Sequence, residues 1–205
     1  PAHPEHKISE RFNLKTYAAV ERYGLIWCSL TAAKNAEPNI PVMPFWDDAE
    51  YQQLVCPKVD IQCFAGRQLE GFIDVAHFAW VHPETFGDPD DVDVPDYTTT
   101  ETDYGFSADY ISGVGRYPIG LDQRGQEDFK WLRHFEISLP FTATLTIHFP
   151  NDAKQVIMNA ASPMTARSTR LFAPICRNYD KDLPVEDAYE FNLKIFEEDR
   201  LIVEN

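Results

Sequence analysis

The sequence predicts an α+β fold in which a curved antiparallel sheet packs against a long C-terminal helix. In the second half of the chain, short runs of aromatic and β-branched residues are separated by Gly, Pro, Asn or Asp, which is typical of antiparallel strands. The segment 184–205 differs, because Pro184 and acidic residues come first and apolar residues then recur at roughly helical intervals.

Composition limits the function classes. The 205 residues are enough for one domain or for one domain with a small appendage, and the second division is favoured. The formal net charge of -15 would repel a phosphate backbone, so nucleic acid is not an expected partner. No apolar run has the length of a membrane span and no signal peptide opens the chain, so we expect a cytoplasmic protein without membrane contact. The four cysteines lack metal or disulfide spacing and are expected to be buried thiols.

The strands are expected in two groups. Residues 16–30 predict two short strands joined at Tyr23 and Gly24, and the three prolines within 35–46 indicate a linker. We therefore divide the chain into residues 1–34, a linker 35–50 and a main domain 51–205. The main domain's sheet is expected to use the runs 51–64, 98–111, 129–139, 141–149, 154–161 and 168–176.

A central helix is predicted from the apolar spacing between Leu69 and Trp80, and it carries two histidines. Glu70, Asp74 and His77 stand at i, i+4 and i+7, which places them on one line of this helix. The ordinary interpretation of such a line is a solvated face. Bulky apolar residues flank it on both sides, however, which favours a polar stripe that lines a cavity.

The second histidine, His82, lies five residues after His77, so the two would point about 140° apart on a regular helix. Pro83 disfavours helical backbone at His82 and is expected to end the helix there, which would let this ring turn back beside His77. Two imidazoles with one carboxylate and open positions suit ferrous iron, and the same ligands would suit zinc. The acid is sought among Glu197, Glu198 and Asp199, for which a solvated acidic face is the alternative.

A family resemblance rests on these residues. The order RQLEGFIDVAHFAWVHPETFG, followed about 115 residues later by FEEDRLIVE, resembles the catalytic domain of Rieske-type non-haem iron oxygenases of the phthalate, vanillate and dicamba group. The resemblance implies a helix-grip (START-like) fold and extends over the whole chain. Residues 1–34 then resemble the end of a Rieske β domain.

The resemblance also implies roles for individual residues. His77, His82 and Asp199 would hold a mononuclear Fe(II), and Asp74 would orient His77 and connect the iron to a Rieske cluster. Gly71 stands where the family often has Asn and opens space near the iron. Chain position suggests further substrate-pocket residues on the strands and the last helix: Phe141, His148, Asn159 and Phe191.

The cluster-binding motifs C-x-H and C-x-x-H are absent from this sequence. A fragment of a longer oxygenase is therefore expected, in preference to a domain that lost its electron-delivery module. The implied cofactors are Fe(II), a 2Fe-2S Rieske cluster in the missing N-terminal part, and NAD(P)H that acts through a reductase. The implied partners are a small aromatic or cyclic substrate, dioxygen, a reductase or ferredoxin, and two further copies in a homotrimer. Hydroxylation and O- or N-demethylation share these iron ligands.

Two other functions use the same residues. A zinc-dependent hydrolase would activate a bound water, and a non-catalytic helix-grip module would bind an apolar ligand without metal. The acidic segment 87–97 could form a calcium-like cluster, but a solvated loop beside the site is the favoured interpretation.

Overall fold

A computed structural model describes residues 5, 7, 9–33, 36–112 and 130–205 of the chain. The chain divides into two compact units, Pro1–Ile40 and Pro41–Asn205, and each is described by itself. None of the described helices is both long enough and apolar enough to cross a membrane.

The first unit is a β-hairpin preceded by a single turn of 3-10 helix, η1 (Glu10–Phe12). Strands β1 (Ala18–Arg22) and β2 (Leu25–Ser29) pair antiparallel. Tyr23 and Gly24 join them with φ of 59° and 69°, and two positive φ angles match the twist of a tight hairpin. The expectation of two strands joined at this dipeptide is confirmed.

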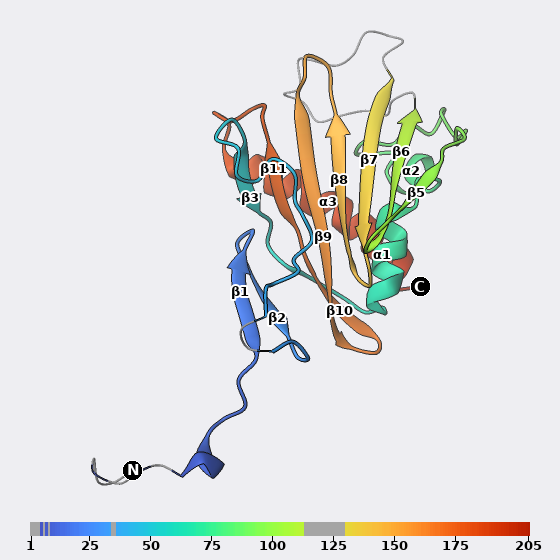
Figure 1. Cartoon of the computed structure of the whole chain (residues 1–205). Helices are drawn as coiled ribbons and strands as arrows, with labels where there is room; N and C mark the ends of the chain where they lie inside the picture. The colour runs from blue at the N-terminus through green and yellow to red at the C-terminus, as the bar shows by residue number, and fades with distance from the viewer. Residues whose placement is uncertain (1–4, 6, 8, 34–35, 113–129) are drawn as a thin grey trace. The chain divides into compact units, whose positions relative to one another are not determined.

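The second unit is an antiparallel sheet with three helices (Figure 1). Its hydrogen-bonded order is β3-β11-β9-β8-β7-β6-β5, and β10 pairs with both β4 and β9. The strands are β3 (Gln52–Val55), β4 (Val59–Ile61), β5 (Thr99–Thr102), β6 (Gly105–Ser112), β7 (Trp131–Ser138), β8 (Thr142–His148), β9 (Lys154–Thr165), β10 (Ser168–Phe172) and β11 (Pro174–Arg177). The helices are α1 (Ala65–Ile73), α2 (Phe78–Val81) and α3 (Val185–Val203).

Three of the predicted strands are each divided into two strands in the structure. Pro57, which has no N–H to donate, lies between β3 and β4, and Ala173 lies between β10 and β11. Because β3 pairs with β11 and β4 with β10, both breaks occur at the same place and the sheet continues across them. The run 98–111 is a hairpin of β5 and β6. A Cβ at Gly105, which begins β6, would stand 2.1 Å from the carbonyl oxygen of Ile137, so only glycine fits there.

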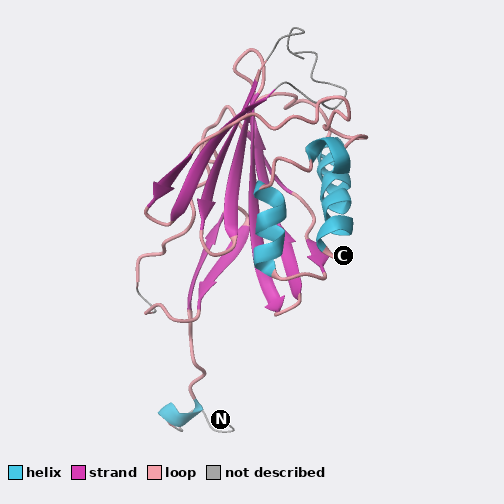
Figure 2. Cartoon of the chain, turned by 90° about the vertical axis from the view of Figure 1, so that its right-hand side faces the viewer, coloured by secondary structure: helices cyan, strands magenta, loops and turns pink. Residues whose placement is uncertain are grey.

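Helices α1 and α3 lie on the same side of the sheet (Figure 2), and the hydrophobic core fills the space between them and the strands. The buried side chains of α3 are Ala188, Asn192, Phe196 and Val203, spaced as one face of a helix. Leu201 and Ile202, which contributed to the predicted apolar pattern, are about half exposed. The α+β prediction is confirmed: this is a curved antiparallel sheet gripped around a long C-terminal helix.

Three of the four cysteines are buried, and all four are free thiols. Burial raises the pKa of Cys56 to about 12, and burial together with the charge of Asp48 raises the pKa of Cys176 to about 12. Very little reactive thiolate therefore forms at either residue near neutral pH. Cys28 departs from the expectation, because it lies exposed on β2.

Candidate metal centre

The predicted central helix is interrupted, which corrects the expectation of one continuous helix up to His82. Helix α1 ends at Ile73, and Asp74 has extended backbone with φ −70° and ψ 127°. The Asp74 carboxylate accepts a hydrogen bond of 2.9 Å from the backbone N–H of Ala76. A short acidic side chain that bonds its own backbone two residues on competes with helix formation, and this explains the break.

The two histidines consequently occupy the ends of the four-residue helix α2. His77 is its N-cap and His82 its C-cap, where the backbone leaves helical geometry at φ −112° and ψ 34° before Pro83. The chain then turns back tightly, with the N–H of Gly87 donating to the carbonyl of His82 at 2.8 Å. A Cβ at Gly87 would stand 2.1 Å from the carbonyl oxygen of Phe78, so this turn needs glycine. The two ring Nε2 atoms approach to 3.0 Å.

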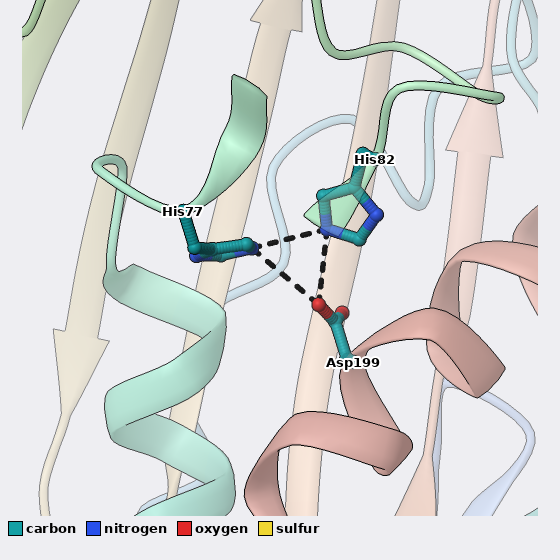
Figure 3. Close-up of side chains that lie close together, drawn as sticks. All are labelled: His77, His82 and Asp199. Carbon is teal, nitrogen blue, oxygen red and sulfur yellow. Dashed lines mark hydrogen bonds and ion pairs between the residues drawn. The ribbon is translucent and has the colours of Figure 1, made fainter. Parts of the chain in front are cut away.

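Helix α3 adds a carboxylate to the pair. The Asp199 Oδ1 atom lies 3.0 Å from Nε2 of His82 and 3.4 Å from Nε2 of His77 (Figure 3). One ligand atom from each of the three residues lies within 4.8 Å of the others, which makes them a possible metal-binding group. His77 and Asp199 are 122 positions apart in the sequence, and the fold brings them together with His82.

The opposite nitrogens of both rings are held by other acids. His77 Nδ1 lies 3.3 Å from Asp74 Oδ2, and His82 Nδ1 lies 2.7 Å from Glu198 Oε2. In the tautomer with hydrogen on Nδ1, each ring donates to its acid and turns the Nε2 lone pair toward Asp199. The group therefore fits a divalent metal: two neutral imidazole donors and one anionic oxygen converge, and each imidazole is already oriented.

The charges within this group favour an ionised carboxylate. Burial raises the pKa of Asp199, but the hydrogen bonds from His77 and His82 outweigh it and leave the pKa below its usual range. Burial also lowers the pKa of His82, and the hydrogen bonds and charges of Asp199 and Glu198 outweigh it, so this pKa is raised. A metal bound at Nε2 of His82 would meet the ionised Asp199 carboxylate, while Glu198 would keep its hydrogen bond to Nδ1 on the other side of the ring.

Two cavities adjoin His77 and Asp199, and His82 lines the inner cavity alone. The inner cavity, about 80 Å³, lies between α3 and strands β7 to β9, and its wall is largely aromatic. The outer cleft, about 450 Å³, lies between α1 and strands β5 to β7. Gly71, His77 and Asp199 line both. A Cβ on Gly71 would stand 3.0 Å from Cγ1 of Val203, so this glycine also permits close packing of α1 on α3.

Of the predicted pocket residues, Gly71 and Phe191 line the inner cavity, whereas Phe141, His148 and Asn159 line neither cavity. Phe141 packs edge to face on Phe64, with ring centroids 5.6 Å apart. His148 follows Ile147 on β8 and so points to the opposite face of the sheet. Position along the chain does not show on which face of a strand a side chain lies, so it could not place His148.

Asn159 points to the same face as Ile157 but lies farther along β9, opposite Ala143. It is 1% exposed, and its amide has no hydrogen-bond partner in the described parts of the chain. Its assignment to the substrate pocket has no support from the cavity geometry.

Sequence reasoning missed the polar residues of the inner cavity, which are Arg133, Gln155, Tyr179 and Asn192. Arg133 and Gln155 lie in strands, Tyr179 lies in the connection after β11, and Asn192 lies within the apolar pattern of α3, so no shared local signal marks them. It also treated Glu198 only as a possible ligand. Glu198 instead accepts hydrogen bonds from the His82 ring and from Oγ1 of Thr85, the latter at 2.8 Å.

We expect Glu198→Ala to weaken iron binding by about 10- to 100-fold, because the variant releases the His82 ring from its orienting partner. Glu198→Gln should retain most of the affinity, since an amide oxygen still accepts from the His82 ring and from Thr85. Glu197→Ala is the control, because Glu197 is exposed and pairs with Arg200. Titration with Fe(II) under anaerobic conditions measures all three, and equal affinities for Glu198→Ala and Glu197→Ala would contradict the role of Glu198.

An antiparallel sheet that grips a long helix, with two imidazoles and one carboxylate on an open face, is the arrangement of a mononuclear non-haem iron domain. Residues 61–205 match the family described as the vanillate O-demethylase oxygenase C-terminal domain, and the chain belongs to this family. The resemblance to Rieske-type oxygenase catalytic domains is thereby confirmed.

Two relatives of described activity are similar to this chain along its whole length. The chain is 26% identical to the methylxanthine N3-demethylase NdmB and 25% identical to the methylxanthine N1-demethylase NdmA, both of Pseudomonas putida. Each alignment covers 100% of this chain and 56% of the relative, so the chain spans about half the length of these proteins.

Solved structures share the fold. The structure of Pseudomonas putida NdmA with caffeine superposes with a TM-score of 0.81 at 23% identity, covering all of this chain and 58% of that one. Dicamba monooxygenase bound to dicamba also gives 0.81, at 18% identity, covering all of this chain and 63% of that one.

Proposed function

We propose that this chain is the catalytic iron domain of a Rieske-type oxygenase that removes methyl groups from oxygen or nitrogen of small aromatic or heteroaromatic compounds. The observation that carries the proposal is the convergence of His77, His82 and Asp199 beside an aromatic-walled cavity. The relatives' described activities, N-demethylation of methylxanthines and the vanillate O-demethylase family, support demethylation in preference to ring hydroxylation.

His77, His82 and Asp199 would hold Fe(II). When bound, the iron supplies reductive activation of dioxygen at its open coordination positions. The overall reaction consumes the methylated substrate, dioxygen, two electrons and two protons, and it releases the demethylated product, formaldehyde and water. Zinc held by the same ligands would instead support hydrolysis by a bound water.

The protein's own contribution is orientation and enclosure. Asp74 and Glu198 hold the two rings, and His82 is only 1% exposed, so the ligand geometry is fixed before substrate enters. The ring of Phe86 stacks on His82 with centroids 4.5 Å apart and excludes water from that side. Asp199 and His77 line both the inner cavity and the larger outer cleft, and the aromatic side chains of the inner cavity would keep a methyl group that reaches the site out of water.

The remaining parts of the enzyme are proposals that follow from family membership. A 2Fe-2S Rieske cluster would lie in a part of the protein outside this chain, with residues 1–34 as the end of that domain and 35–50 as the linker. A reductase that uses NAD(P)H, or a ferredoxin, would supply electrons through the cluster and Asp74. A homotrimer would let the cluster of one copy serve the iron of the next, and the cytoplasm would supply the reductant.

The full-length protein that contains this chain tests the proposal. After anaerobic loading with Fe(II), we expect about one mononuclear iron per chain beyond the cluster iron, and a nitric oxide adduct with the paramagnetic resonance signal of a ferrous nitrosyl. With reductase, NADH and 4-methoxyacetophenone, formaldehyde should appear in step with oxygen uptake. Zinc bound in preference to iron, or hydrolysis without oxygen uptake, would contradict the proposal.

A further inference from the structure

The turn that follows His82 places a hydroxyl group against the acid that holds the His82 ring. Thr85 is 6% exposed and lines neither cavity. Its Oγ1 donates a hydrogen bond of 2.8 Å to Oε2 of Glu198, the same oxygen that lies 2.7 Å from Nδ1 of His82. In the tautomer with hydrogen on Nδ1, one carboxylate oxygen thus accepts from a hydroxyl and from an imidazole, which occupies both of its lone pairs.

The backbone of His82 sets the position of the Thr85 side chain. The carbonyl of His82 accepts the N–H of Thr85 at 3.1 Å and the N–H of Gly87 at 2.8 Å, so the turn is closed by two backbone bonds. The Thr85 hydroxyl also lies 3.5 Å from this carbonyl, but its bond to the carboxylate is shorter and is strengthened by the negative charge. A β-branched side chain has few favourable rotamers, so Oγ1 is held in one place.

These contacts form a closed circuit. The His82 backbone positions Thr85, the Thr85 hydroxyl positions the Glu198 carboxylate, and this carboxylate positions the His82 ring. In the part of the chain that the structure describes, no group donates to the other carboxylate oxygen, Oε1. Loss of the hydroxyl would therefore leave the carboxylate free to rotate on a long side chain, and the ring that it holds would lose its fixed plane.

A second contact joins the same turn to α3, but it is exposed. Lys194 Nζ lies 3.2 Å from Oε2 of Glu84, and these side chains are 48% and 78% exposed. Lys194 and Glu198 are four residues apart, so both contacts lie on one face of the helix. Because an exposed ion pair contributes little, the enclosed bond from Thr85 to Glu198 is the one that fixes the turn on α3.

We propose that Thr85 is a positioning residue of the metal centre: its hydroxyl fixes the Glu198 carboxylate, and through it the ring plane that directs Nε2 of His82 at the metal. The inference rests on the proposed function, because the metal is the Fe(II) proposed for this site. His77 has a looser support, since its partner Asp74 lies 3.3 Å away and is 46% exposed. His82 is the ligand whose direction is set before the metal binds.

Two substitutions of Thr85 in the full-length protein test the proposal by anaerobic titration with Fe(II) and, separately, with Zn(II). Thr85→Val keeps the shape of the side chain and removes the hydroxyl. We expect it to bind either metal about 10-fold more weakly, which is the size of one lost hydrogen bond to a charged group. Thr85→Ser restores the hydroxyl and should bind within about twofold of wild type.

Thr169→Val is the matched control. Thr169 is 1% exposed, donates to the carbonyl of Cys63 at 2.8 Å and lines neither cavity. This variant loses a buried hydroxyl bond of the same length at a place away from the metal group, so its affinity for both metals should equal that of wild type.

Two further measurements separate positioning from a general effect on folding. In the nitric oxide adduct of the iron-loaded protein, Thr85→Val should broaden the paramagnetic resonance signal, because the His82 ring takes several orientations, whereas Thr169→Val should not. In a Glu198→Ala background, Thr85→Val should cause no further loss of affinity, since the hydroxyl acts through the carboxylate.

Binding by Thr85→Val as tight as that of wild type overturns the proposal, and so does an equal loss of affinity with and without the Glu198 carboxylate. A wild-type preference for Zn(II) over Fe(II) would contradict the proposed oxygenase function. The Zn(II) titrations of the same variants would then still decide the role of Thr85.

Discussion

Replacing Asp199 with alanine is expected to abolish mononuclear iron binding and to lower demethylation by at least about 1000-fold, since loss of an outer partner alone typically costs 10- to 100-fold. Asp199 supplies the anionic atom of the three, and its Oδ1 approaches both imidazole Nε2 atoms. Without it, two neutral nitrogens would have to hold a divalent cation, and the positive charge would be uncompensated in a largely buried site.

The matched control is Glu197→Ala on the same helix. It removes the same charge two residues away, but Glu197 is exposed and bonds Arg200. Metal analysis of the two purified variants, with the cluster iron counted separately, gives the comparison, and circular dichroism checks that α3 still folds. Retention of mononuclear iron by Asp199→Ala would show that another acid, such as Glu198, is the ligand.

The sequence was sufficient for the parts of the site that depend on local spacing. The Tyr23-Gly24 dipeptide predicts the hairpin, Pro184 precedes α3, and the spacing of Asp74, His77 and His82 indicates part of the metal group. Each of these signals is read from neighbouring residues. The distant acid, Asp199, was assigned only through the family resemblance.

Other features depend on contacts that no local pattern records. The helix break at Asp74 arises because its side chain bonds the backbone of Ala76, although the apolar spacing continues through this point. Glu198 and Asp199 are adjacent acids, and only the approach of α3 to α2 shows that one faces the metal position while the other holds His82. The polar lining of the inner cavity depends on which face of each strand points inward, and a single sequence does not reveal that when both faces are buried.

We expect Asp74→Asn to keep its mononuclear iron and yet to lose about 100-fold or more in steady-state demethylation, an effect on the scale of a lost catalytic interaction. The asparagine oxygen can still accept the N–H of Ala76, so the turn between α1 and α2 is retained. The negative charge is lost. The Asp74 side chain is 46% exposed while its Oδ2 reaches Nδ1 of His77, so it connects the proposed metal ligand His77 to the protein surface.

In the proposed function, Asp74 would couple an electron donor outside the chain to the site, because it contacts His77 and is also exposed. An amide cannot accept a proton or stabilise a protonated imidazole as a carboxylate does, so coupling between the donor and His77 should fail while metal binding survives. Stopped-flow oxidation of the pre-reduced cluster by dioxygen measures the step directly, and metal analysis confirms that the mononuclear site is occupied.

Glu70→Gln is the control, because Glu70 lies one turn earlier on α1, is more exposed and pairs with Arg67. Equal slowing of cluster oxidation in both variants would assign the effect to surface charge. Loss of mononuclear iron in Asp74→Asn would show that Asp74 only orients His77.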